Sequence, residues 1–309
     1  MLQLNTLVIE NAVANQSEAM EAETISKNGK NLKSQMSRKN IFKKAFSTIL
    51  AAACFTAVAY TQSGYIDDIE WKIVGNKLII SGTGKVRSQN NSSYPWNSYY
   101  DAMSKVSTVI IESGVENIPD YAFSNWSKIT TVTIPNTVTT IEKNAFFRTG
   151  LKTINIPSSV TTMGGDVFND CDELTSINVD NNNTEYSSEN GVLFNKTKTI
   201  LIRYPEGKTN TVYIIPNTVK ILESRCFERC GSKSVTIPSS VTTIKKEAFK
   251  LCGRITQIIN YATEPQKIDS NDVFSTGARL LVPAESKEVY RKDKYWNASF
   301  ASIVAIPND

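Results

Sequence analysis

The sequence of 309 residues contains no histidine. Histidine is the commonest general base near neutral pH, and it activates Ser and Cys nucleophiles. It is also a frequent zinc ligand, so its absence excludes every His-containing metal site. We therefore expect a protein that is not an enzyme and that holds no cofactor.

Long apolar runs are also scarce. The run from Ala45 to Ala59 is shorter than the roughly 20 residues that span a bilayer. Basic residues between positions 38 and 44 precede it, and Ala57-Val58-Ala59 ends it as an Ala-x-Ala cleavage site. Residues 36–59 are thus predicted to be a secretory signal peptide. An ordinary buried helix is the alternative, and no transmembrane segment is expected after signal removal.

The segment before this run is polar. Residues 1–35 either form a disordered leader or precede the true start of translation at Met36. Cys54, after three alanines, leaves open a lipoprotein anchor, although apolar residues rather than a polar tether follow it. In each case the expected location is outside the cell, secreted or on the cell surface.

Excess charge of one sign is missing from the rest of the chain. Residues 60–309 hold 27 Lys/Arg and 26 Asp/Glu. A body this close to neutral argues against nucleic acid or an anionic membrane as the main partner.

Cysteines are few as well. Cys171, Cys230 and Cys252 share one position, three residues after a Phe, where Trp126 and Thr149 stand in other repeats. A position that accepts Cys, Trp or Thr is a packing position rather than part of a disulfide framework. Whether Cys230 and Cys252 pair stays open.

What the chain has in abundance is a repeat. Units of 22 and 23 residues begin at Ile134-Pro135 and Ile156-Pro157, and the same apolar pattern returns at Ile215-Pro216 and Ile237-Pro238. Aliphatic residues at fixed offsets with a period of 20 to 29 residues are the signature of a leucine-rich repeat. The predicted fold is a β-rich α/β repeat solenoid, a right-handed coil with a parallel sheet on its concave face. One Phe per unit is expected to form a core spine: Phe123, Phe146, Phe168, Phe227, Phe249 and Phe274.

Three segments follow the signal. Residues 60–104 are predicted to form an N-terminal β cap containing a hairpin that turns at Gly75-Asn76. Residues 105–282 hold the repeats, with an insert at 180–214 that suggests an extra hairpin. Residues 283–309 form a C-terminal cap with a helix over Ser286–Tyr295. An aromatic group around Trp96, with Tyr99 and Tyr100, either packs the first cap or offers a sugar platform.

The repeat resembles a known one. Residues 237–258 carry Ile-Pro, then Val241, Ile244, Ala248-Phe249, Cys252, Ile255 and Ile258. This is similar to the repeat of the BspA-type leucine-rich-repeat proteins of bacterial surfaces. The likeness extends over about residues 65–305, with Lys233 and Thr149 as modest departures. It implies a secreted or surface-exposed protein of a kind often linked to adhesion, without identifying a ligand.

The leading interpretation is a noncatalytic binding or adhesion protein that contacts a host or bacterial macromolecule, protein or glycan, as a monomer. Strand side chains alternate, so eight short neutral residues are expected on the concave face: Thr131, Thr133, Thr153, Asn155, Ser176, Asn178, Ser234 and Thr236. The insert at 180–214 is a second candidate for binding. A passive spacer is one alternative. A glycan-active enzyme using paired carboxylates, Asp67-Asp68 or Asp172-Glu173, is another.

Overall fold

The N-terminal part of the structure, a computed structural model, is an antiparallel sheet. The structure describes residues 62–89, 94–98, 104–268 and 271–307. The predicted leader, signal peptide and Cys54 therefore lie outside the described residues, as do Tyr99 and Tyr100. Strands β1 (Gln62–Ile66), β2 (Ile69–Val74) and β3 (Lys77–Gly82) pair in order. Gly75, with φ of 61°, forms the turn between β2 and β3. Strand β1 was not predicted.

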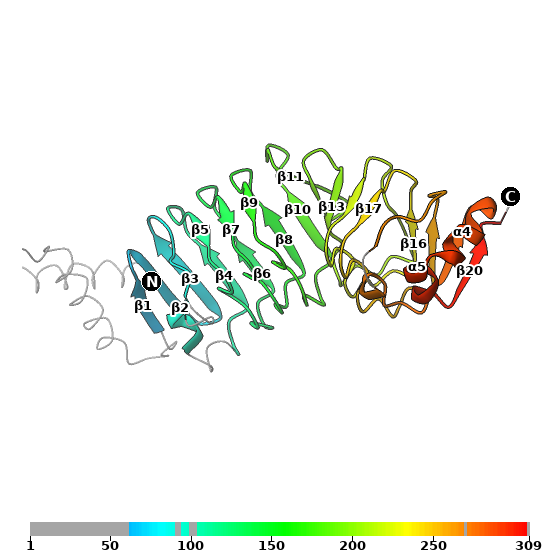
Figure 1. Ribbon diagram of the computed structural model, residues 1–309. Coiled ribbons are helices and arrows are strands. Elements are labelled where there is room, and N and C mark those ends of the chain that lie inside the picture. Colours follow the sequence, from blue (N-terminus) through cyan, green and yellow to red (C-terminus); the bar gives the residue numbers. More distant parts are fainter. Residues whose placement is uncertain (1–61, 90–93, 99–103, 269–270, 308–309) are drawn as a thin grey trace, which may run out of the picture. The chain divides into compact units, whose positions relative to one another are not determined.

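Short parallel strands follow and continue from β3 (Figure 1). Each coil gives one strand to a main set. The members of this main set are β4 (Thr108–Ile111), β6 (Thr131–Thr133), β8 (Thr153–Ile156), β10 (Ser176–Val179), β14 (Val212–Ile214), β16 (Ser234–Ile237), β18 (Gln257–Asn260), β19 (Arg279–Val282) and β20 (Ser302–Ala305). These strands pair in register within three groups: β4 with β6, β8 with β10, and β14 through β20.

A second set of two- to four-residue strands lies at another corner of the coils. It holds β5 (Asn117–Ile118), β7 (Thr140–Ile141), β9 (Thr162–Met163), β13 (Ile200–Arg203), β15 (Ile221–Leu222) and β17 (Thr243–Ile244). Because most units pair their strands with a unit beside them, the described coils form a β-solenoid, with breaks in the main set between β6 and β8 and between β10 and β14.

The predicted Phe spine is buried and stacked in two runs, one from Phe123 to Phe168 and one from Phe227 to Phe274, with Tyr204 stacked on Phe227 at the start of the second. Ring centroids lie 5.5 Å apart for Phe123 and Phe146 and 4.8 Å apart for Phe227 and Phe249. In most coils the residues two before and two after the Phe have positive φ, among them Asn144 (54°) and Arg148 (56°). These left-handed residues turn the chain sharply around the ring, and burial of the ring offsets their conformational cost.

The four described cysteines are free and buried. Cys252 donates its S–H to the main-chain oxygen of Phe227 at 2.9 Å, and Cys171 donates to that of Phe146 at 3.1 Å. In the coil where Thr149 replaces Cys, Thr149 Oγ1 instead donates to the main-chain oxygen of Phe146 in its own coil at 3.0 Å, so the buried hydroxyl has a partner. Burial raises the pKa of Cys230 to about 11, so the thiol stays protonated.

The insert lengthens one coil. Strands β11 (Tyr186–Glu189) and β12 (Val192–Asn195) form an antiparallel hairpin, and β12 also pairs antiparallel with β13. Asn183 fixes the entry to the hairpin, since its side chain donates to the carbonyl oxygens of Pro157 and Val160 and accepts from two main-chain N–H groups.

The C-terminal end corrects the prediction of one helix over Ser286–Tyr295. Short helices α4 (Lys287–Lys292) and α5 (Lys294–Ser299) are separated at Asp293, whose extended backbone (ψ 124°) ends the first helix. The Asp293 side chain accepts from the N–H groups of Tyr295 and Trp296 and so begins the second helix.

The remaining described elements are the 3₁₀ turns η2 (Pro95–Ser98), η3 (Asn271–Val273) and η4 (Ala284–Ser286). Strand β20, also not predicted, returns the chain to the main set.

Candidate binding surface

The outer face of the main strands carries the predicted neutral side chains in the N-terminal half. In β6, Thr131 and Thr133 are exposed while Val132 between them is buried. In β8, Thr153 and Asn155 are exposed in the same way. Strand alternation thus places hydroxyl and amide groups on one surface and the aliphatic groups in the core.

Strand β10 continues this surface. Ser176 is aligned with Thr153 and is half-buried, and Asn178 is aligned with Asn155 and is exposed. Asn178 Nδ2 donates to Asn155 Oδ1 at 3.0 Å, and Ser176 Oγ donates to Asn178 Oδ1 at 2.7 Å. The side chains are therefore linked in a hydrogen-bonded ladder across two coils.

The prediction that Ser234 and Thr236 belong to this exposed ladder is wrong, because each is only 9% exposed. Both are short, and both stand between larger side chains in the register. Ser234 lies between Val212 and Gln257. Thr236 lies between Ile214 and Ile259 in the same way. The larger neighbours shield the short ones.

The residues that sequence reasoning missed are Val212 and Ile214. They are 50% and 66% exposed. The repeat pattern could have identified them as outward-facing, because Ile214 precedes Ile215-Pro216 just as Asn155 precedes Ile156-Pro157. The outer surface therefore changes character at the extended coil, from hydroxyl and amide groups to aliphatic ones.

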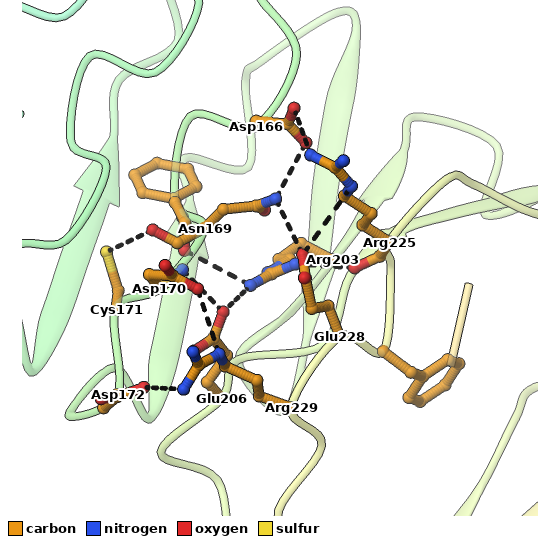
Figure 2. Close-up of polar contacts among 12 residues, drawn as sticks. Asp166, Asn169, Asp170, Cys171, Asp172, Arg203, Glu206, Arg225, Glu228 and Arg229 are labelled. Atoms are coloured by element: carbon orange, nitrogen blue, oxygen red, sulfur yellow. Dashed lines mark hydrogen bonds and ion pairs between the residues drawn. The ribbon is translucent and has the colours of Figure 1, made fainter. Parts of the chain in front are cut away.

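At this change the coils are joined by a network of charged side chains (Figure 2). Arg203 and Glu206 form a buried ion pair, with side chains 6% and 2% exposed. Arg203 Nη1 donates to the main-chain oxygen of Arg225 at 2.6 Å, and Glu206 Oε1 accepts from the N–H of Asp170 at 2.8 Å. The pair thus connects the coil before the insert to the coil after it.

An outer layer of charges surrounds the pair. Arg225 contacts Asp166 at 3.0 Å, and Arg229 contacts Asp170 at 3.1 Å. Asn169 Nδ2 donates to Glu228 Oε2 at 3.1 Å. Burial raises the pKa of Glu206 to about 7, against the lowering effect of Arg203 and of the Asp170 N–H. These contacts join side chains of different coils, and we interpret them as contacts that stabilise the fold.

Beside the start of β14 lies a surface pocket of about 310 Å³, lined by Thr209, Thr211, Gly231, Lys233 and Arg254. No carboxylate lines it. Neither Lys233 nor Arg254 makes an ion pair with another described residue. The pocket is therefore a neutral and basic surface next to exposed aliphatic side chains.

The carboxylates considered for catalysis lie in ordinary surface surroundings. Asp67 pairs with Arg87 at 3.2 Å, and Asp172, with a 73% exposed side chain, lies 3.7 Å from Arg229. Within the part of the chain that the structure describes, no group of three Cys, Asp or Glu residues could hold a metal ion. Their surroundings favour solvated surface groups.

Trp96, the described member of the predicted aromatic group, is buried rather than exposed. Trp96 is fully buried, stacks on Tyr94 at 4.9 Å and donates its indole N–H to the main-chain oxygen of Ala122 at 3.0 Å. It also stacks on Phe123 and so begins the spine. A sugar platform at Trp96 is excluded by this burial.

The described helices are all short. Over residues 62–89, 94–98, 104–268 and 271–307, none has the length and apolar character to cross a membrane.

Comparison with known proteins agrees with the repeat. The model of the family described as "BspA type Leucine rich repeat region" matches residues 95–213 and 206–280 in six copies. These residues make up more than half of the chain, and no enzyme family is indicated. No curated protein matches the sequence.

Solved structures resemble the chain as well. A leucine rich cell surface protein from Faecalibacterium prausnitzii is 27% identical, with a TM-score of 0.50, over 67% of this chain and 62% of that one. A leucine-rich repeat protein from Eubacterium ventriosum is 23% identical, with a TM-score of 0.47, over 79% and 84% of the two chains. The pneumococcal vaccine antigen PcpA is 16% identical, with a TM-score of 0.42, over 82% and 100%.

Proposed function

Since the chain belongs to the BspA-type leucine-rich-repeat family, we propose that it is a noncatalytic binding protein, secreted or exposed on the cell surface, that adheres to a protein or glycan. The observation that carries the proposal is the exposed ladder on β6, β8 and β10. It presents hydroxyl and amide groups from three consecutive coils without a charged side chain among them. The resemblance to a Faecalibacterium prausnitzii cell surface protein supports the location.

Such a surface binds through many neutral hydrogen bonds. With little charge to steer association, the affinity is expected to be modest and to depend weakly on salt. We also propose that both ends of the solenoid are capped, by β1–β3 at one end and by α4, α5 and β20 at the other. The caps cover the terminal coils and so keep the protein monomeric.

The experiment uses residues 60–309 in solution. Biolayer interferometry against a panel of host matrix proteins and bacterial surface glycans should yield a partner whose affinity changes little between about 0.05 M and about 0.5 M NaCl. An affinity that falls by orders of magnitude over that range would point to charge-driven binding and contradict the proposal. Turnover of any glycan in the panel would favour the enzyme alternative, and failure of the whole panel would favour the passive spacer.

Export can be tested separately. We propose cleavage after Ala59, so the mature protein secreted by a bacterial host should begin at Tyr60 by intact-mass measurement. A product that keeps residues before Cys54 would exclude both this signal peptide and the lipoprotein alternative.

A further inference from the structure

The main strands are interrupted at the extended coil, and the interruption leaves one strand edge open. Strand β10 pairs with β8, and on its other side the N–H of Ile177 donates to the main-chain oxygen of Gly191 in the β11–β12 turn at 2.9 Å. The hairpin turn therefore covers β10. Strand β14 stands at the edge of its sheet and pairs, among the described strands, with β16 alone.

The hydrogen bonds of β14 show which peptide groups face the open edge. The oxygen of Thr211 accepts from Ser234 at 3.0 Å, and the N–H of Ile215 donates to Thr236 at 3.0 Å. In a parallel pair, alternate residues bond to the same neighbour. Thr211, Tyr213 and Ile215 therefore bond to β16, and the N–H and C=O groups of Val212 and Ile214 point to the open side.

The side chains of these two residues are the exposed aliphatic groups described above. An open edge with exposed β-branched side chains is a template for an additional strand. The pocket next to it adds a charge preference. Lys233 and Arg254 line it without a carboxylate, and Thr209 and Thr211 supply hydroxyl groups at the point where β14 begins.

We propose that β14 binds an extended segment of a partner protein by strand addition, with apolar residues over Val212 and Ile214 and an Asp or Glu in the Lys233–Arg254 pocket. Main-chain hydrogen bonds supply affinity in this mode, and alternate side chains supply selectivity. The inference rests on the proposed binding function and names a partner class for it, but it uses a surface separate from the ladder on β6, β8 and β10.

The test selects peptides from a random displayed library on residues 60–309, and then compares the affinity of the enriched peptides for this protein and for the variant Lys233→Glu/Arg254→Glu. Enriched peptides should carry an acidic residue beside alternating apolar residues. They should lose at least tenfold in affinity for the double variant. An enriched set that is basic, or that binds both proteins equally, would overturn the proposal.

Amide hydrogen exchange by NMR then locates the binding on the unmodified protein. A selected peptide should slow exchange at Val212 and Ile214 and leave Tyr213, already bonded to β16, unchanged. The variant Ile214→Pro removes one donor from the open edge and should weaken binding, whereas Ile214→Thr keeps that donor and serves as its matched control. Peptide binding without protection of Val212 and Ile214 would refute strand addition.

Two other possible occupants of the β14 edge and its pocket would give different results in these experiments. Protection of the same amides that rises with protein concentration, without peptide, would assign the edge to a second copy of the chain. Binding of a sulfated glycan to the pocket with unchanged amide exchange would assign it to an anionic polysaccharide. The variant Thr133→Lys/Asn155→Lys/Asn178→Lys should still bind the selected peptide, so failure of the ladder and failure of the β14 site are distinguishable.

Discussion

The N–H of Asp170 donates to the side chain of Glu206 at 2.8 Å, where other coils use a main-chain oxygen. The equivalent donors are Asn125, Arg148 and Arg229, and they donate to the carbonyl groups of Phe147, Asn169 and Lys250. At the extended coil a carboxylate therefore replaces the carbonyl of the next repeat. Leu201 is aligned with Leu222, but Tyr204 follows Leu201 by three residues whereas Phe227 follows Leu222 by five. The backbone is shorter at this point, and the Glu206 side chain supplies the acceptor.

Loss of one member of the buried pair is expected to be costly. Arg203→Leu leaves Glu206 buried without its partner, and such a change typically destabilises a protein by about 3–5 kcal/mol. The double variant Arg203→Leu/Glu206→Leu should recover part of this loss, because no charge remains uncompensated. Urea unfolding of residues 60–309 measures both.

The matched control for that comparison is Arg148→Ala. Arg148 pairs with Asp170 at 2.9 Å, but its side chain is 58% exposed. Exposed pairs contribute about 0–1 kcal/mol. A loss for Arg203→Leu no larger than for this control would show that the buried pair does not hold the coils together.

Stability should also depend on pH through Glu206. Burial raises its pKa from 4.5 to about 7, so between these values the folded state binds more protons than the unfolded state. The free energy of unfolding should therefore fall as the pH rises through this window, by on the order of 3 kcal/mol from this group. Glu206→Gln, which cannot ionise, should flatten the curve. Identical pH profiles for the two proteins would contradict the assignment.

The Phe spine predicts large losses on truncation. Phe146→Ala and Phe249→Ala each remove a fully buried ring stacked on both neighbours, and each should cost about 3–5 kcal/mol. Thermal unfolding measures this. Tyr261→Ala, at a 48% exposed ring, is the control and should change stability by less than about 0.5 kcal/mol. A barely shifted melt for either Phe variant would exclude the ring from the core.

The sequence predicted the repeat because each coil buries the same positions. Leu151, Ile154 and Ile156 are all buried, as the aliphatic spacing requires. It did not predict β1 or β20, since short strands at the two ends carry no repeat of their own. It also did not predict that Asp293 would divide the C-terminal helix, because capping by its side chain competes with a continuous helical pattern.

The surface was harder to predict than the core. Alternation places Thr236 outward, but its exposure depends on the size of Ile214 and Ile259, which lie 22 and 23 residues away along the chain. In the sequence, nothing distinguishes Arg203 and Glu206 from ordinary exposed charged residues of an insert. Their burial follows from the register between coils, and the insert disrupts that register.

The last prediction tests the ladder itself. Three lysines on β6, β8 and β10 would place like charges on adjacent strands about 4.8 Å apart. They would also remove the bond between Asn178 and Asn155. Binding to the partner found by interferometry should be lost, because neutral hydrogen-bonding groups are replaced by strongly hydrated charges. Exposed substitutions usually change stability little, so the thermal melt should stay close to that of the unmodified protein. The variant is Thr133→Lys/Asn155→Lys/Asn178→Lys.

A matched triple variant tests whether the position of the added charges, rather than their number, decides the loss of binding. Thr139, Thr161 and Thr242 are exposed and lie beside the second set of strands. Changing these three to Lys adds the same charge away from the ladder, so binding should persist. If both triple variants lose binding, net charge rather than the ladder governs it. If both keep binding, the partner uses another surface, with the insert at residues 180–214 as the first candidate, and the assignment of the ladder is wrong.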